Sequence, residues 1–253
     1  MGNKNNWTDE EHILAFNLYC KIPFSKINAH YPPVKELASI LKRSNNAVAM
    51  KLANFARLDP SLKARNISGL TQGAKGEEVI WNKFNHNWEE LAYQSECILA
   101  KYNGEPIGHE LKDIPIDIIG REREAIVKLR INQNFFRKMI LASYNTTCCI
   151  TGSRTHELLT ACHIIPWNID KTNRMNPQNG LCMNILYHSA FDQGFLTITP
   201  EYNILISKHL YNKKDPFIDK LFINIDNNKI ILPQKFIPNK LFLKYHNDFI
   251  FKK

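Results

Sequence analysis

The chain contains 253 residues, enough for one large domain or for two smaller ones of roughly 100–200 residues each. With 44% hydrophobic and 23% charged residues, its composition excludes collagen-like, low-complexity and intrinsically disordered proteins. No apolar run approaches the roughly 18–20 residues of a membrane-spanning helix, and the polar N-terminus lacks the apolar core of a secretory signal. We therefore expect a cytoplasmic protein with no membrane partner.

The charge of the chain is strongly basic. Lysine and arginine outnumber aspartate and glutamate by 33 to 24, which gives a net charge of +9. Such a charge favours polyanions such as DNA, because basic side chains release counterions from them; a merely soluble basic protein is the alternative. Without a secretory signal, we expect the six cysteines to be reduced thiols, and because they include no C-x-x-C pair we expect no structural zinc.

The first predicted helix begins at a capping box. Thr8 is a suitable N-cap, and Glu11 lies three residues later, where its carboxylate reaches back to the cap. Prolines at positions 23, 32 and 33 then interrupt the chain.

Two further helices are predicted next, over residues 34–42 and from residue 46 onward, joined by a turn at 43–45. The later helix carries Val48, Leu52 and Phe55 on one apolar stripe. This pattern is typical of a helix-turn-helix, and an ordinary helical hairpin with a solvated face is the alternative. The polar residues off the stripe, which we expect to face DNA, are Asn45, Asn46, Lys51 and Asn54.

The expected domain boundary follows a helical stretch at residues 76–99 whose aromatic side chains we assign to the core. Residues 101–120 are rich in glycine and proline and are interpreted as a linker. The prediction is a helical domain at 1–100 and a second domain at 121–253.

The second domain begins with a charged helical stretch from residue 121 and continues with short β-like runs. We expect a long polar loop at 168–180 and a short helix at 184–192 that ends near Gly194. The expected strands cover residues 148–151, 158–165, 195–198, 204–206 and 230–232.

Three polar residues stand out in this domain. His163 interrupts an apolar strand end, and Asn179 lies in a turn where its amide can bond to neighbouring backbone. His188 precedes Asp192 by four residues on the predicted helix, so their side chains share a face. The other histidines considered lack matched ligand spacing, and we interpret them as structural or surface residues: His156, His209 and His246.

Four segments carry a family resemblance: residues 149–152 (CITG), 161–167 (ACHIIPW), 176–181 (NPQNGL) and 188–194 (HSAFDQG). In this order they resemble the HNH nucleases, the ββα-metal endonucleases, in the subgroup found in bacterial restriction enzymes. The run at 245–251 (YHNDFIF) is similar to the tails of such proteins. The N-terminal part resembles a domain often fused to them.

The resemblance implies an α+β fold, with a mostly α-helical, winged helix-turn-helix-like domain followed by a ββα-metal nuclease domain. It implies that His163 is the general base that deprotonates the attacking water, and that Asn179 holds the loop that aims it. His188, with Asp192 beside it, would bind a divalent metal ion that contacts the scissile phosphate. Mg²⁺ is the expected ion, with Mn²⁺ or another divalent ion as alternatives, and the products would carry 5′-phosphate and 3′-hydroxyl ends.

One position departs from the family pattern. Many members place an acidic metal ligand immediately before the catalytic histidine, and this chain has Cys162 there. A thiolate is a poor match for Mg²⁺, which prefers oxygen. We interpret Cys162 as a buried core residue; the alternative is a site that favours a softer ion.

The implied function is a metal-dependent restriction endonuclease that hydrolyses phosphodiester bonds in double-stranded DNA, with methylated or hydroxymethylated cytosine as a candidate target and unmodified DNA as the alternative. A single core cuts one strand, so we expect a homodimer, and a separate DNA methyltransferase is a candidate partner. The alternatives are an inactive DNA-binding regulator and a homing or mobile-element nuclease. The site of action would be the bacterial nucleoid.

Three arginines are assigned to phosphate contacts, with surface ion pairs as the alternative: Arg130, Arg137 and Arg174.

Overall fold

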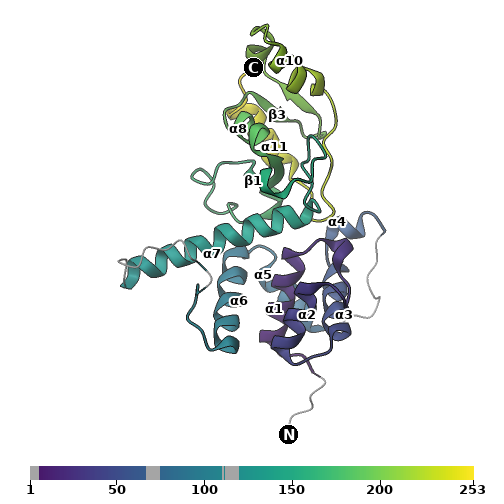
Figure 1. Cartoon of the computed structure of the whole chain (residues 1–253), viewed down its shortest axis with the longest axis vertical. Helices are drawn as coiled ribbons and strands as arrows, with labels where there is room; N and C mark the ends of the chain where they lie inside the picture. The colour runs from purple at the N-terminus through teal and green to yellow at the C-terminus, as the bar shows by residue number, and fades with distance from the viewer. Residues whose placement is uncertain (1–5, 67–74, 110, 112–119) are drawn as a thin grey trace. The chain divides into compact units, whose positions relative to one another are not determined.

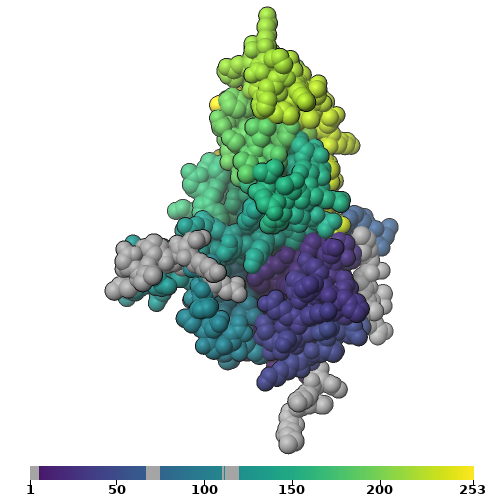
Figure 2. Space-filling view, in the orientation of Figure 1, coloured from purple at the N-terminus to yellow at the C-terminus, as the bar shows by residue number. Residues whose placement is uncertain are grey.

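The structure is a computed structural model that describes residues 6–66, 75–109, 111 and 120–253. The chain divides into two compact units, residues 1–142 and 143–253, and each can be followed by colour in Figure 1 and Figure 2. The linker expected at 101–120 falls in part on residues outside the described part of the chain. The division into 1–100 and 121–253 therefore stays a prediction.

The first unit is built from helices. Among its described residues no strand occurs, so the expected wing is not found there. No helix in the described parts of either unit is long and apolar enough to cross a membrane. The α-helices of this unit are α1 (Asp9–Lys21), α2 (Pro32–Leu41), α3 (Asn45–Ala56), α4 (Pro60–Lys63), α5 (Lys75–Phe84), α6 (Trp88–Asn103) and α7 (Gly120–Ser143), whose last residue belongs to the second unit.

The sequence pattern explains how these helices begin and pack. The capping box is confirmed, since the Thr8 hydroxyl accepts from the Glu11 N–H and the Glu11 carboxylate accepts from the Thr8 N–H. Phe16 of α1 lies at the centre of the core, with its ring centroid 4.9 Å from that of Phe55 and 5.1 Å from that of Trp81. Trp81, Phe84 and Trp88 of the 76–99 stretch are thus core residues, as predicted, although the stretch is two helices rather than one.

The second unit contains the strands, and their presence confirms the α+β fold class. Strand β1 (Leu159–His163) pairs antiparallel with β2 (Gly180–Asn184), with His163 opposite Gly180. Helix α8 (Ile185–Asp192) follows β2 directly and packs on both strands, which forms a ββα unit (Figure 1). The remaining strands and α-helices of this unit are β3 (Leu196–Ile198), β4 (Ile204–Ile206), α9 (Lys208–Tyr211), α10 (Pro216–Leu221) and α11 (Lys240–Phe249).

Three strand predictions differ from the structure. Residues 148–151 form a turn, in which the Cys148 sulfur accepts the N–H of Thr151 at 3.5 Å and of Asn184 at 3.4 Å. Strand β2 was missed because four of its five residues are buried, so it shows no alternation of apolar and polar residues. Residues 230–232 form no strand, and the neighbouring Lys229 makes an isolated bridge to Asn203.

The C-terminal segment holds the end of α8 in place. Helix α11 packs on β3, and the Lys252 N–H donates to the Gly194 carbonyl oxygen at 2.9 Å. Gly194 has a φ of +72°, and a Cβ built on it would lie 2.2 Å from the Ile250 carbonyl oxygen. Only glycine fits this close approach, which fixes the chain two residues after Asp192.

Candidate metal and catalytic site

Asn179 closes the loop between β1 and β2. Its side chain is fully buried. Its Oδ1 accepts the Ile165 N–H at 2.8 Å, and its Nδ2 donates to the carbonyl oxygens of Ile165 at 3.1 Å and Asn173 at 3.3 Å. These bonds hold the backbone just after His163 against the start of β2. Asn179, which its turn position singled out in the sequence, therefore holds backbone groups of this loop together.

His163, at the end of β1, has a defined orientation. Its Nε2 lies 2.9 Å from the carbonyl oxygen of Arg174. A carbonyl oxygen only accepts hydrogen bonds, so Nε2 carries the proton and the neutral ring has its lone pair on Nδ1. Burial lowers the pKa of His163 below its usual value, with the nearby His188 adding to this effect and the Arg174 carbonyl opposing it. The ring is thus neutral at pH 7 and has the tautomer of a base that acts through Nδ1.

His188, on α8, lies between a hydroxyl and a carboxylate. The Thr160 hydroxyl lies 2.8 Å from Nδ1 of His188 and 3.1 Å from the Met183 carbonyl oxygen, and Nε2 of His188 lies 3.2 Å from Oδ2 of Asp192. In the tautomer that a metal ligand requires, the proton is on Nδ1, where the Thr160 oxygen can accept it, and the lone pair is on Nε2. Thr160 could not be singled out from the sequence, because one threonine on a short strand carries no distinguishing signal.

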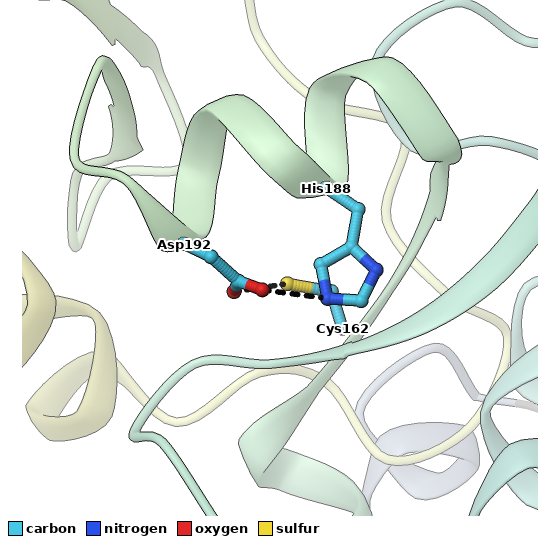
Figure 3. Close-up of side chains that lie close together, drawn as sticks. All are labelled: Cys162, His188 and Asp192. Carbon is cyan, nitrogen blue, oxygen red and sulfur yellow. Dashed lines mark hydrogen bonds and ion pairs between the residues drawn. The ribbon is translucent and has the colours of Figure 1, made fainter.

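Cys162 completes a group of three possible metal ligands. Its sulfur lies 3.8 Å from Oδ1 of Asp192, and one ligand atom from each of Cys162, His188 and Asp192 lies within 4.8 Å of the others. Figure 3 shows His188 and Asp192 descending from α8 toward Cys162 on the strand below. Cys162 is fully buried, as predicted. Burial and the Asp192 carboxylate raise the pKa of its thiol well above the usual range.

One cavity of about 360 Å³ in the second unit lies beside this group, and His188 and Asp192 are part of its wall. The cavity wall includes His163, Trp167, His188, Asp192 and a residue from α11, His246. The Thr197 hydroxyl lies 2.7 Å from Nδ1 of His246, and the Nε2 of His246 lies 3.1 Å from the Phe191 carbonyl oxygen, beside Asp192 in the chain. His246 is therefore a structural residue, as predicted, and one that borders the site. Its signal in the sequence was the run at 245–251.

The three arginines assigned to phosphate contacts lie in different places. Arg174 is half-buried in the loop after β1, and its guanidinium lies 4.9 Å from the centre of the Trp167 ring. Arg130 is exposed and bonds to Gln133, and Arg137 is half-buried; both lie on α7. Their roles toward DNA stay predictions.

The residues expected to face DNA from α3 separate into two pairs. Asn45 and Asn46 are exposed, so they stay candidates. Lys51 and Asn54 are buried, with only 6% and 8% of their surface exposed, and both bond to Glu77 of α5. The expectation that these two side chains lie free on an outer face is therefore wrong. Glu77 comes 23 residues after Asn54, so the helical pattern of α3 could not reveal it.

Comparison with known protein families places the site in a matched segment. Residues 148–199 match the model of a family described as HNH endonuclease. The segment contains β1, β2, α8 and β3, and with them His163, Asn179, His188, Asp192 and Cys162. No curated protein matches the chain.

Proposed function

From the HNH endonuclease match and from the site, we propose that the protein is a metal-dependent endonuclease that hydrolyses phosphodiester bonds in double-stranded DNA. One observation carries the proposal. Two histidines line one cavity: His163, whose Nε2–H bonds to the Arg174 carbonyl oxygen so that its lone pair is on Nδ1, and His188, whose Nε2 lies beside the Asp192 carboxylate. One base and one metal ligand are what hydrolysis of a phosphodiester by an activated water requires.

His163 acts as the general base in this proposal. Its Nδ1 takes a proton from the water that attacks phosphorus, and the Arg174 carbonyl then stabilises the imidazolium through Nε2–H. A lowered pKa keeps the ring unprotonated at pH 7, which a base requires. Asn179 holds the loop that carries Arg174, so it positions the base without touching the substrate.

The donor set of His188 and Asp192 fits a divalent cation. Nε2 of His188 and Oδ2 of Asp192 lie 3.2 Å apart, and the Asp192 side chain is exposed. A bound divalent ion would stabilise the negative charge that develops on the scissile phosphate and the leaving oxygen. Beside it, Arg174 is placed to receive a phosphate, since its guanidinium lies on the Trp167 ring that lines the same cavity.

The biological role that we propose is restriction. The helical hairpin of α2 and α3, with Asn45 and Asn46 exposed, would serve as the helix-turn-helix-like reader of DNA. We propose a homodimer for cutting both strands, modified cytosine as the candidate target, and a separate methyltransferase as a candidate partner. The proposed location is the bacterial cytoplasm, at the nucleoid.

Plasmid nicking and linearisation test the proposal. Wild-type protein is freed of metal by a chelator, then assayed with Mg²⁺, Mn²⁺, Co²⁺ or Zn²⁺ on unmodified, methylated and hydroxymethylated plasmid. We expect metal-dependent cleavage, and we expect His163→Ala to reduce its rate by about 10²–10⁴-fold, the usual contribution of a general base.

His156→Ala is the matched control, because His156 is exposed and lies just before β1, away from the cavity residues. Its cleavage rate should equal that of the wild type. Binding to DNA without cleavage under every condition would instead support the regulator, and equal rates for His163→Ala and wild type would remove His163 from catalysis. Sedimentation on cognate DNA tests the dimer, which a monomer that cuts both strands in one encounter would exclude.

A further inference from the structure

We propose that Cys162 is the third protein ligand of the metal ion, and that the site therefore takes a divalent transition ion of the zinc or cobalt type in preference to Mg²⁺. The inference rests on the proposed function and deepens it, because it names the class of cofactor. It departs from the expectation that Cys162 only fills the core.

The separations between the side-chain atoms are close to those between the ligands of a zinc ion. Zinc bonds of about 2.3 Å to sulfur, 2.0–2.1 Å to nitrogen and 2.0–2.2 Å to oxygen put tetrahedral ligands about 3.6 Å apart for sulfur and oxygen and about 3.4 Å apart for nitrogen and oxygen. Cys162 Sγ lies 3.8 Å from Asp192 Oδ1, and His188 Nε2 lies 3.2 Å from Asp192 Oδ2. The two separations involve the two oxygens of the Asp192 carboxylate, and one ligand atom from each of the three residues lies within 4.8 Å of the others, close enough for one ion to bind all three (Figure 3). A fourth position would be left for substrate or water.

The contacts around His188 also suit a metal ligand. With the His188 proton on Nδ1, the Thr160 hydroxyl can accept it and donate in turn to the Met183 carbonyl oxygen, and Nε2 then directs its lone pair toward the Asp192 carboxylate. A cation between Nε2 and the carboxylate stabilises this tautomer, because both atoms are then electron-rich. A metal-ligating histidine usually donates its other ring N–H to an oxygen acceptor, and Thr160 provides one here.

The identity of the third donor decides which ion fits. Sulfur is a soft ligand that favours zinc-like ions, whereas Mg²⁺ requires oxygen donors in an octahedral arrangement. One thiol, one imidazole and one carboxylate therefore form a donor set for a transition ion. When the sulfur–metal bond forms, the thiol proton passes to solvent.

Cobalt titration of the chelator-treated, full-length protein tests the proposal, because Co²⁺ reports sulfur ligation through a charge-transfer band in the near ultraviolet. We expect one bound Co²⁺ per chain with this band in the wild type. Cys162→Ser should lose the band and weaken Co²⁺ binding by at least about tenfold. Cys149→Ser is the matched control, since Cys149 is an equally buried thiol outside the group of three, and it should keep both.

Selectivity is measured by competition. A large excess of Mg²⁺ should fail to displace Co²⁺ from the wild type but should compete in Cys162→Asp, which restores an oxygen donor at this position. Should the variants fail to fold, as judged by circular dichroism, X-ray absorption of the zinc-loaded wild type detects a sulfur neighbour at about 2.3 Å directly.

Co²⁺ bound without a sulfur band, or no Co²⁺ bound at all, would overturn the assignment of Cys162 and leave the nuclease proposal to its own cleavage assay. A sulfur band in a protein that cleaves no DNA with any ion would have the opposite meaning. It would keep Cys162 as a ligand and remove the nuclease function.

Discussion

Each unit of the protein contains a histidine next to a carboxylate, and the two pairs are built differently. In the first unit Glu77 is fully buried and paired with Lys51, whose Nζ lies 3.2 Å from Nε2 of His12. In the second unit Asp192 is exposed, and its charge partner is His188, which supplies positive charge only when protonated. The first cluster contains its own permanent cation, whereas the second leaves that place to a proton or a bound ion.

The difference shows how a structural cluster and a functional one can be told apart. Both contain the residue types of a metal or catalytic site, so composition does not separate them. The direction of the hydrogen bonds does, because Lys51 and Asn54 donate to Glu77 and balance its charge within the fold. At Asp192 the charge partner is a histidine, which supplies no positive charge while its ring is neutral.

The largest expected effect in this comparison is on the stability of the first unit. Lys51→Met should destabilise the protein by about 3–5 kcal/mol, because it leaves the Glu77 carboxylate buried without its charge partner. Urea unfolding at pH 7 measures the loss, and Co²⁺ affinity should be unchanged.

The double variant Lys51→Met, Glu77→Leu is the control for this prediction. Removing both charges together should recover much of the lost stability, since an apolar pair of similar volume often replaces a buried ion pair without cost. A single Lys51→Met variant as stable as the wild type would show that Glu77 is not held by Lys51.

The second effect is a dependence of stability on pH that comes from His246. Burial lowers the pKa of His246 from 6.5 to about 4, although the hydrogen bond to the Phe191 carbonyl and the Asp192 carboxylate both act to raise it. Above pH 6.5 the ring is neutral in both the folded and unfolded chains, and its stabilising contribution is complete. As the pH falls toward 4 only the unfolded chain binds a proton, so about 2 kcal/mol should be lost by pH 5.

Urea unfolding of wild type and His246→Gln at pH 7 and pH 5 measures this contribution. The variant should lose less stability than the wild type between the two pH values, whereas His156→Gln, which changes an exposed histidine, should behave as the wild type does. An identical pH dependence for wild type and His246→Gln would contradict the prediction.

Local patterns in the sequence were enough to predict the elements that depend on neighbouring residues. The capping box at Thr8 and Glu11, the strands at Leu196–Ile198 and Ile204–Ile206, and the short helix ending at Asp192 all depend on contacts within a few positions. Strand β2 was missed because its buried residues do not alternate with exposed ones.

The site could be predicted only as far as its motif residues. Their order pointed to His163, Asn179 and His188, but the groups that orient them left no mark in the sequence. His163 is held by a backbone carbonyl, that of Arg174, which any residue would provide. The burial of Lys51 depends on a helix that begins 24 residues later, beyond the reach of a helical pattern.

The smallest expected effect concerns the hydroxyl next to His188. Thr160→Val removes the hydroxyl that lies 2.8 Å from Nδ1 of His188 while keeping a β-branched side chain of similar size on β1. We expect Co²⁺ affinity to fall by about tenfold, or about 1.4 kcal/mol, because a ring that binds the ion through Nε2 loses the acceptor for its Nδ1–H.

Thr160→Ser is the matched control, since it keeps the hydroxyl and removes only a methyl group, and its Co²⁺ affinity should stay close to that of the wild type. A loss of stability alone cannot lower Co²⁺ affinity in Thr160→Val and leave it unchanged in Thr160→Ser, because any loss of packing should be at least as large in the serine variant. If valine binds Co²⁺ as tightly as serine does, the tautomer of His188 is not set by Thr160. The difference between the Glu77 cluster, which contains its own cation, and the Asp192 cluster, which we propose binds an ion, would then depend on Cys162 and Asp192 alone.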